Sequence, residues 1–279
     1  MRSGTPSRTA WAAAAHRAAH QVLEGGRIFA DPLAVRILGE DADRAIRRAA
    51  AGPLARGMRI FIAARTRFAE DALAAAVEDG VRQLVILGAG LDTYAYRGEH
   101  RERLRIFEVD HPATQAWKRE RLAVAAIPIP VSVAFAPVDF DRLTLADGLA
   151  AAGFDAGRRA FFTWLGVVPY LGGDAVWATL GFVAGLAGGA QVAFDYGEPP
   201  DALPEDRRAA HEARASRVAE VGEPWVTFFA PEELRARLAA TGFSRVEDLG
   251  PRQIAARYFP AHAGRAPERG GHVVLAGTV

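Results

Sequence analysis

The chain has 279 residues, with 34 Lys and Arg against 33 Asp and Glu, so its formal net charge is +1. This balance excludes a nucleic-acid-binding protein that works through bulk positive charge. The absence of cysteine excludes disulfides, zinc–cysteine sites, iron–sulfur clusters and a thiol nucleophile, and it fits a reducing cytoplasm.

The first part of the chain has a helical pattern. From Thr9 to about Val77, apolar residues return at spacings of three and four, with arginines between them. Breaks that divide this region into several helices fall at Gly25-Gly26, Asp31-Pro32 and Gly52-Pro53. We therefore expect a helical cap over residues 1–80.

Membrane and targeting segments are not expected. The apolar run at residues 11–15 ends at His16, before it reaches the length of a signal peptide. Later runs are shorter than the ~18–20 residues that cross a bilayer. We expect a soluble, cytoplasmic protein without a membrane partner.

Short apolar runs begin at Arg82, and the segments between them are long enough for a helix each. These runs cover residues 84–87, 105–109, 131–138, 160–165 and 191–196. Continuous runs of this length suit strands buried on both faces, and their alternation with helices predicts a mostly parallel sheet with right-handed crossovers. We assign the ligand-binding core to residues 81–196.

The remaining chain predicts a lid and an antiparallel edge. Residues 197–230 carry helical charge spacing at 205–220 and read as an insertion that covers the carboxyl edge of the sheet. Residues 231–279 predict a helix that Pro231 opens and Gly242 closes, then strands at 244–249 and 272–278 without a clear helix between them. All these parts are expected to form a single α/β domain, 1–279.

Three loops at predicted strand ends carry candidate binding residues. Gly88, Ala89 and Gly90 follow the first strand, where glycines let the backbone turn sharply and approach a ligand. Asp110 closes the next strand, about twenty residues on, where a carboxylate suits a ribose diol. Asp139 and Phe140 follow the third strand, where they suit the amine and the ring of an adenine. The carboxyl ends of parallel strands meet at one crevice, so we expect the three loops to face one ligand.

Each of these loops also has a purely structural interpretation. The glycines suit a tight turn, the carboxylate at 110 suits a helix N-cap because His111-Pro112 follows, and Asp139 suits a turn. The third glycine of a dinucleotide fingerprint is missing, because Thr93 occupies its place.

The motifs together resemble the leucine carboxyl methyltransferase family and its bacterial relatives, which are class I S-adenosylmethionine (SAM)-dependent methyltransferases. The strings that carry the resemblance are VILGAGLDTYAYR, FEVDHPATQAWKRERL, VDF, FFTWLGVVPYL and EELRARLAATGF, with IFADPLA and FIAARTRFAEDAL near the amino terminus. The resemblance weakens at residues 197–226 and 250–270. It implies a Rossmann-like, seven-stranded, mostly parallel sheet with an antiparallel carboxyl-terminal strand, and SAM as cofactor.

The resemblance also implies residue roles. Gly88, with Ala89 and Gly90, would lie under the methionine part of SAM, Asp110 would hold the ribose hydroxyls, and Asp139 with Phe140 would contact the adenine. Arg65 would pair with the SAM carboxylate, a task that suits a bidentate guanidinium, and Arg17 would assist it. A solvated helix arginine is the alternative for Arg65.

One departure from the family lies at Leu165-Gly166, where several members carry a glutamate before the glycine. A polar contact near the methionine amine is therefore absent or supplied elsewhere. The protein phosphatase that is the family's substrate is therefore not carried over to this chain.

The methyl acceptor is expected to be a small molecule, with a carboxylate favoured over a phenol. A carboxylate needs no base, whereas a phenol benefits from one, and His111 and Tyr170 are the catalytic candidates by residue type and place. A structural hydrogen-bonding role at a helix start is the alternative for His111. Trp164, Tyr94 and Tyr96 are candidates for aromatic walls and also for core positions.

The sequence therefore predicts an O-methyltransferase of secondary metabolism, without a metal site. One alternative is a methyltransferase-fold protein that binds SAM without methyl transfer, as a cyclase or regulator. Another is a nicotinamide-dependent oxidoreductase, against which Thr93 argues. Oligomeric state has no signal in the sequence.

Overall fold

The computed structural model describes residues 7–52, 55–140, 142–220 and 222–278. The chain divides into two compact units, residues 1–155 and 156–279. The candidate break at Gly52-Pro53 extends into residues outside the described ranges.

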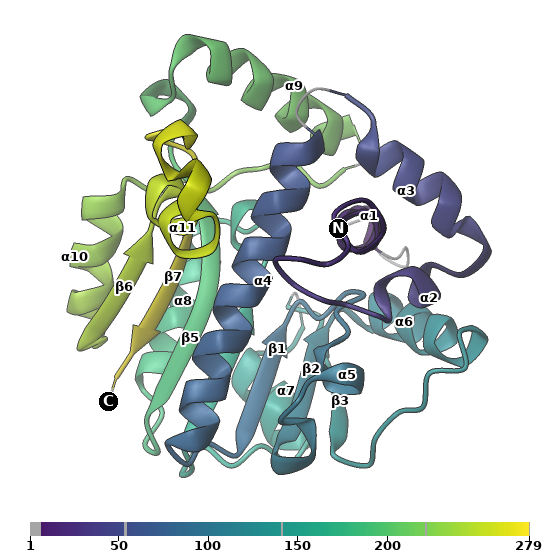
Figure 1. The fold of residues 1–279 in the computed structure, drawn as a ribbon. Helices are drawn as coiled ribbons and strands as arrows, with labels where there is room; N and C mark the ends of the chain where they lie inside the picture. The colour runs from purple at the N-terminus through teal and green to yellow at the C-terminus, as the bar shows by residue number, and fades with distance from the viewer. Residues whose placement is uncertain (1–6, 53–54, 141, 221, 279) are drawn as a thin grey trace. The chain divides into compact units, whose positions relative to one another are not determined.

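The first unit begins with the expected helices. They are α1 (Arg8–Leu23), α2 (Ala34–Leu38), a 3₁₀ turn η1 (Gly39–Asp41), α3 (Ala42–Ala50) and α4 (Ala55–Glu78). Ser7 caps α1 by accepting a hydrogen bond from the Ala10 amide at 3.1 Å. Helix α1 packs on α2, α3 and α4 (Figure 1).

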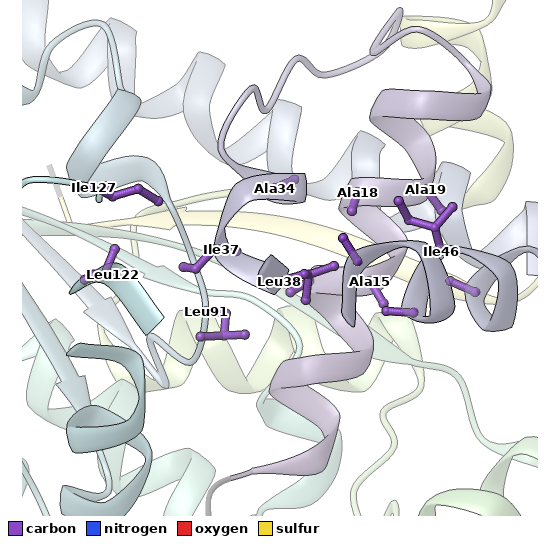
Figure 2. Close-up of a cluster of buried hydrophobic side chains, with 14 residues drawn as sticks. Ala15, Ala18, Ala19, Ala34, Ile37, Leu38, Ile46, Leu91, Leu122 and Ile127 are labelled. Carbon is purple, nitrogen blue, oxygen red and sulfur yellow. The ribbon is translucent and has the colours of Figure 1, made fainter. Parts of the chain in front are cut away.

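A buried apolar cluster joins these helices to the loop that follows the first strand. Figure 2 shows Ala15, Ala18 and Ala19 of α1 beside Ile37, Leu38 and Ile46 of α2 and α3. Leu91, just beyond the glycine loop, belongs to the same cluster and is 1% exposed. Alanines allow the helices to approach closely, and the burial of Leu91 ties the glycine loop to the helical layer.

The sheet of the first unit has three parallel strands. They are β1 (Gln83–Leu87), β2 (Arg105–Asp110) and β3 (Val133–Pro137), in the order β3-β2-β1. The connections contain α5 (Tyr94–Arg97), η2 (Arg101–Arg103), α6 (Pro112–Val124) and, after β3, α7 (Leu145–Ala151). All five residues of β1 are buried, as a continuous apolar run predicts.

The second unit holds four strands in the order β4-β5-β7-β6. Its elements are β4 (Ala160–Trp164), η3 (Val168–Tyr170), α8 (Gly173–Ala184), β5 (Ala190–Gly197), η4 (Pro200–Ala202), α9 (Glu205–Glu220), α10 (Pro231–Thr241), β6 (Arg245–Leu249), α11 (Pro251–Tyr258), η5 (Pro260–Arg265) and β7 (Gly271–Gly277). Strands β4 and β5 are parallel, while β7 is antiparallel to both β5 and β6. Gly242 closes α10 with φ of 115°, as expected.

One expectation for this unit is wrong: a helix, α11, lies between the last two strands. Its N-terminal Pro251 suits a first helical turn, and Ile254 and Ala255 are its buried residues. The predicted antiparallel pairing of the two strands is confirmed. With seven strands among the described residues, mostly parallel and ending in an antiparallel strand, the predicted fold class is also confirmed.

In the described part of the chain, no helix is both long and apolar enough to cross a membrane.

Candidate functional site

The glycine loop follows β1 directly and needs glycine at two positions. Gly88 and Gly90 have φ values of 63° and 41°, in the left-handed region that side chains disfavour. A Cβ atom on Gly90 would lie 2.9 Å from the Cβ of Ala10 in α1. Gly88 is exposed at the strand end, so its backbone is open to a ligand.

Asp110 ties the end of β2 to this loop. Its Oδ2 accepts a hydrogen bond from the Gly90 amide at 2.6 Å, and its Oδ1 accepts one from the His111 amide at 2.7 Å. Burial raises the pKa of Asp110, and these two amides partly oppose that rise. Each carboxylate oxygen keeps further acceptor capacity, which a ribose hydroxyl can use.

His111, and not Asp110, caps helix α6. Its Nδ1 accepts a hydrogen bond from the Ala113 amide at 3.2 Å, and Pro112 occupies the first helical turn. The structural interpretation of His111 is therefore the one that the geometry supports.

Asp139 and Phe140 lie just beyond β3. The Val138 amide donates to the Asp110 carbonyl at 2.9 Å, which continues the ladder and brings the two strand ends together. The Asp139 carbonyl accepts hydrogen bonds from the amides of Arg142 and Leu143, so the residue also forms a turn. The Phe140 ring is 62% exposed, which leaves its face available to a flat ligand.

A buried ion pair lies beneath the glycine loop. Lys118, the one lysine of the sequence, lies 2.8 Å from Glu108 Oε2 and 3.5 Å from the Ala89 carbonyl oxygen. Burial raises the pKa of Glu108, although Lys118 lowers it. The Lys118 ammonium also lies 5.4 Å from the centre of the Tyr96 ring. Glu108 and Lys118 therefore support the loop from the interior.

Arg17 is buried and committed to groups of the protein. Its Nε lies 3.2 Å from Asp31 Oδ2, and its Nη2 donates to the Leu91 carbonyl at 2.5 Å. These contacts leave Arg17 holding the loop after β1. They do not support the expected direct contact with the cofactor carboxylate.

Asp31 is the centre of this network. Besides Arg17, it accepts a hydrogen bond from the Thr93 hydroxyl at 2.8 Å and pairs with Arg97 at 3.3 Å. Arg97 also pairs with Glu70 of α4 at 2.5 Å. Burial would lower the pKa of Arg97, but the carboxylates of Glu70 and Asp31 outweigh it and raise that pKa. The network joins the helical layer to the segment after the glycine loop.

Arg65 lies on α4 and is 9% exposed, with its guanidinium carbon 5.9 Å from the centre of the Phe61 ring. This burial excludes the alternative of a solvated helix arginine.

The second unit places an acidic side chain beside the departure at Leu165-Gly166. The Gly166 amide donates to Asp195 Oδ1 at 2.6 Å, and Asp195 is 3% exposed near the end of β5. Asp195 was not predicted from the sequence. Its signal was a carboxylate inside the otherwise uncharged run at residues 191–196.

The aromatic candidates differ in exposure. Trp164 and Tyr94 are buried, which places them in the cores of their units. Tyr96 is half-buried, and its hydroxyl faces Glu108. Tyr170, in η3 of the second unit, is half-buried after the end of β4. Within the described ranges, no group of three or more His, Asp or Glu side chains is arranged to hold a metal ion.

A glycine loop after the first strand and a carboxylate at the end of the next strand are the arrangement expected of a nucleotide-cofactor site in a Rossmann-like sheet. Residues 10–184 match the family model of leucine carboxyl methyltransferase, and the chain belongs to this family.

Curated relatives agree with this assignment. The chain is 32% identical over 198 residues to YktD of Bacillus subtilis, named a putative S-adenosyl-L-methionine-dependent methyltransferase, covering 70% of this chain and 65% of YktD. It is 39% identical over 132 residues to Rv1896c of Mycobacterium tuberculosis, of the same description, covering 47% and 43%. The chain thus spans about two thirds or less of these relatives. Their names confirm SAM as the expected cofactor.

A solved structure is similar in fold. It is a putative methyltransferase from Thermobifida fusca, with a TM-score of 0.58 and 19% identity, covering 99% of this chain and 96% of that one.

Proposed function

We propose that the protein is a SAM-dependent O-methyltransferase that acts on a small-molecule carboxylate or phenol of secondary metabolism in the cytoplasm. The observation that carries this proposal is the Asp110 carboxylate, which the backbone amides of Gly90 and His111 fix against the glycine loop. Family membership supports the same cofactor.

The residues present fit the cofactor. Asp110 would accept hydrogen bonds from the ribose hydroxyls, while Gly88, Ala89 and Gly90 would lie under the methionine part. Phe140 and Asp139 would contact the adenine. Arg65 would bind the carboxylate of SAM, and Arg17 would hold the loop in place from below.

Bound SAM would supply an electrophilic methyl group: a lone pair of the acceptor oxygen would form the new O–CH₃ bond, and the S–CH₃ electron pair would stay on sulfur in S-adenosylhomocysteine. An ionised carboxylate loses no proton in this step, so it needs no base. We favour a carboxylate acceptor because the Nδ1 atom of His111 is committed to the Ala113 amide, and because the matching family is named for carboxyl methylation.

The alternatives follow from the same site. Binding of SAM without methyl transfer, as in a cyclase or regulator, would use the same cofactor residues. A nicotinamide oxidoreductase is disfavoured because Thr93, in place of the third glycine, is fully buried and bonded to Asp31.

The test is incubation of the full chain with SAM carrying a radiolabelled methyl group and a panel of small carboxylic acids and phenols. We expect labelled products that release methanol in mild alkali, because methyl esters hydrolyse there and aryl methyl ethers do not. A labelled product that resists alkali would identify a phenol as the methyl acceptor instead. Cofactor binding without any labelled product would favour the alternative without methyl transfer.

Replacing His111 with alanine should lower the free energy of unfolding by about 1 kcal/mol, because the cap of α6 is lost. The methyl-transfer rate at saturating substrates should stay unchanged. Asparagine, a good N-cap that cannot act as a base, should restore the stability. A fall of about 10²-fold or more in transfer by both variants would instead identify His111 as a catalytic base.

A further inference from the structure

Residues 223–229 of the second unit form a segment that lies across the carboxyl ends of β4 and β5. The amides of Val226 and Thr227 donate to the Pro169 carbonyl at 2.7 and 3.3 Å, and the Thr227 hydroxyl donates to the Leu171 carbonyl. The Phe229 amide donates to the Gly197 carbonyl at 3.1 Å. These bonds fix the segment at the edge where parallel strands present ligands.

Three rings lie together here, two from this segment and one from α9. His211 of α9 lies with its ring centre 5.2 Å from that of Trp225 and 5.4 Å from that of Phe228. A Cβ atom placed on Gly197 would lie 3.6 Å from Phe228 Cδ1, so this ring packs over the end of β5.

These rings are more exposed than the aromatic residues in the strands of the unit. Trp225, Phe228 and His211 are each half-buried, and Val226 between the first two is 53% exposed. By contrast, Phe194 and Trp164 in the strands are at most 2% exposed. Partly exposed apolar side chains that gather at the carboxyl ends of parallel strands suit a binding site.

The chemistry of the patch favours a planar, uncharged ring system as occupant. Tilted aromatic faces offer edge and offset contacts that a flat π-system uses and an aliphatic chain does not. Burial lowers the pKa of His211, Arg214 one turn away lowers it further, and Glu212 opposes this. Glu223 is the ionisable residue of the facing segment. A neutral imidazole offers one hydrogen-bond donor and one acceptor to polar groups on such a ring.

We propose that Trp225, Phe228 and His211 form an aromatic platform that binds the planar ring of the methyl acceptor. This inference rests on the proposed function and narrows its substrate class to aromatic acids and phenols. The platform explains why the lid helix α9 carries a histidine against two rings.

The test uses two probes that share a carboxylate and differ in planarity, 2-naphthoate and decalin-2-carboxylate, titrated into the full chain with saturating S-adenosylhomocysteine. We expect 2-naphthoate to bind at least about fivefold more tightly than its saturated counterpart. Trp225→Ala and Phe228→Ala should each weaken 2-naphthoate binding about fivefold or more. Trp225→Leu, which keeps an apolar side chain but removes the aromatic face, should also weaken it and serves if the alanine variant does not fold.

Phe259→Ala is the matched control, because Phe259 is a half-buried ring of the same unit at the end of α11. It should leave 2-naphthoate binding unchanged. Equal binding of the two probes, no 2-naphthoate binding, or unchanged affinity in the platform variants would overturn the platform. So would a wild-type dimer that Trp225→Leu converts to a monomer, because a second copy would then cover the patch. Separate titration of S-adenosylhomocysteine keeps the tests distinct, since its failure to bind would overturn the proposed function itself.

Discussion

Alanine at position 110 is expected to weaken S-adenosylhomocysteine binding about 10- to 150-fold. Hydrogen bonds to an ionised group contribute about 1.5–3 kcal/mol, and about 1.4 kcal/mol corresponds to a tenfold change in affinity. The same substitution also leaves the amides of Gly90 and His111 without their acceptor, so the loop itself loses support. Isothermal titration calorimetry measures the affinity, and thermal unfolding without ligand measures the loss of stability.

The two consequences of this substitution can be separated with a second ligand. An S-adenosylhomocysteine analogue without the ribose 2′-hydroxyl should bind the wild type more weakly than the parent ligand does. The Asp110→Ala variant should bind the analogue and the parent ligand with equal affinity. Asp43→Ala, which removes an exposed carboxylate of α3, should change neither affinity. If the variant still distinguishes the two ligands as the wild type does, Asp110 does not hold the ribose.

Much of the fold could be predicted because its signals are local. The five short apolar runs coincide with β1 to β5 within two residues at each end, since central strands of a parallel sheet are mostly apolar. The helix at 205–220 was also predicted, from its charge spacing. Helix α11 was missed because its eight residues lie in a stretch rich in Gly, Pro and Arg, with only two buried side chains. Such a helix depends on tertiary packing more than on its own pattern.

The candidate site likewise has residues that the sequence predicts and contacts that it does not. The glycine loop and Asp110 could be found because each directly follows a strand, and strand ends are visible in the sequence. The partners of Arg17 could not be found, because Asp31 is 14 and Leu91 is 74 residues away. Gly166 and Asp195 are 29 residues apart, and their hydrogen bond likewise leaves no periodic pattern. Contacts between distant residues are set by the packed fold, so only the structure brings them together.

Removing the Asp31 carboxylate is expected to be the most destabilising of these substitutions. Asp31 is 1% exposed and faces two guanidinium groups, those of Arg17 and Arg97. Asp31→Ala would leave buried positive charge without its partner, which typically costs about 3–5 kcal/mol. Asp41→Ala is the matched control, because its ion pair with Arg44 is largely exposed and is expected to contribute less than about 1 kcal/mol. Chemical denaturation of both variants measures the difference.

The network also predicts that stability and cofactor affinity fall together at Asp31. Its partners Arg17 and Thr93 hold the segment that follows the glycine loop, through the Leu91 carbonyl and the Thr93 hydroxyl. Asp31→Asn keeps an acceptor for Thr93 but removes the charge, so it should lose stability while retaining more affinity for S-adenosylhomocysteine than Asp31→Ala. Arg17→Met in the Asp31→Ala background should recover part of the stability, because one orphaned charge is gone. No recovery in that double variant would mean that the cost of losing Asp31 comes from the Thr93 and Arg97 contacts instead.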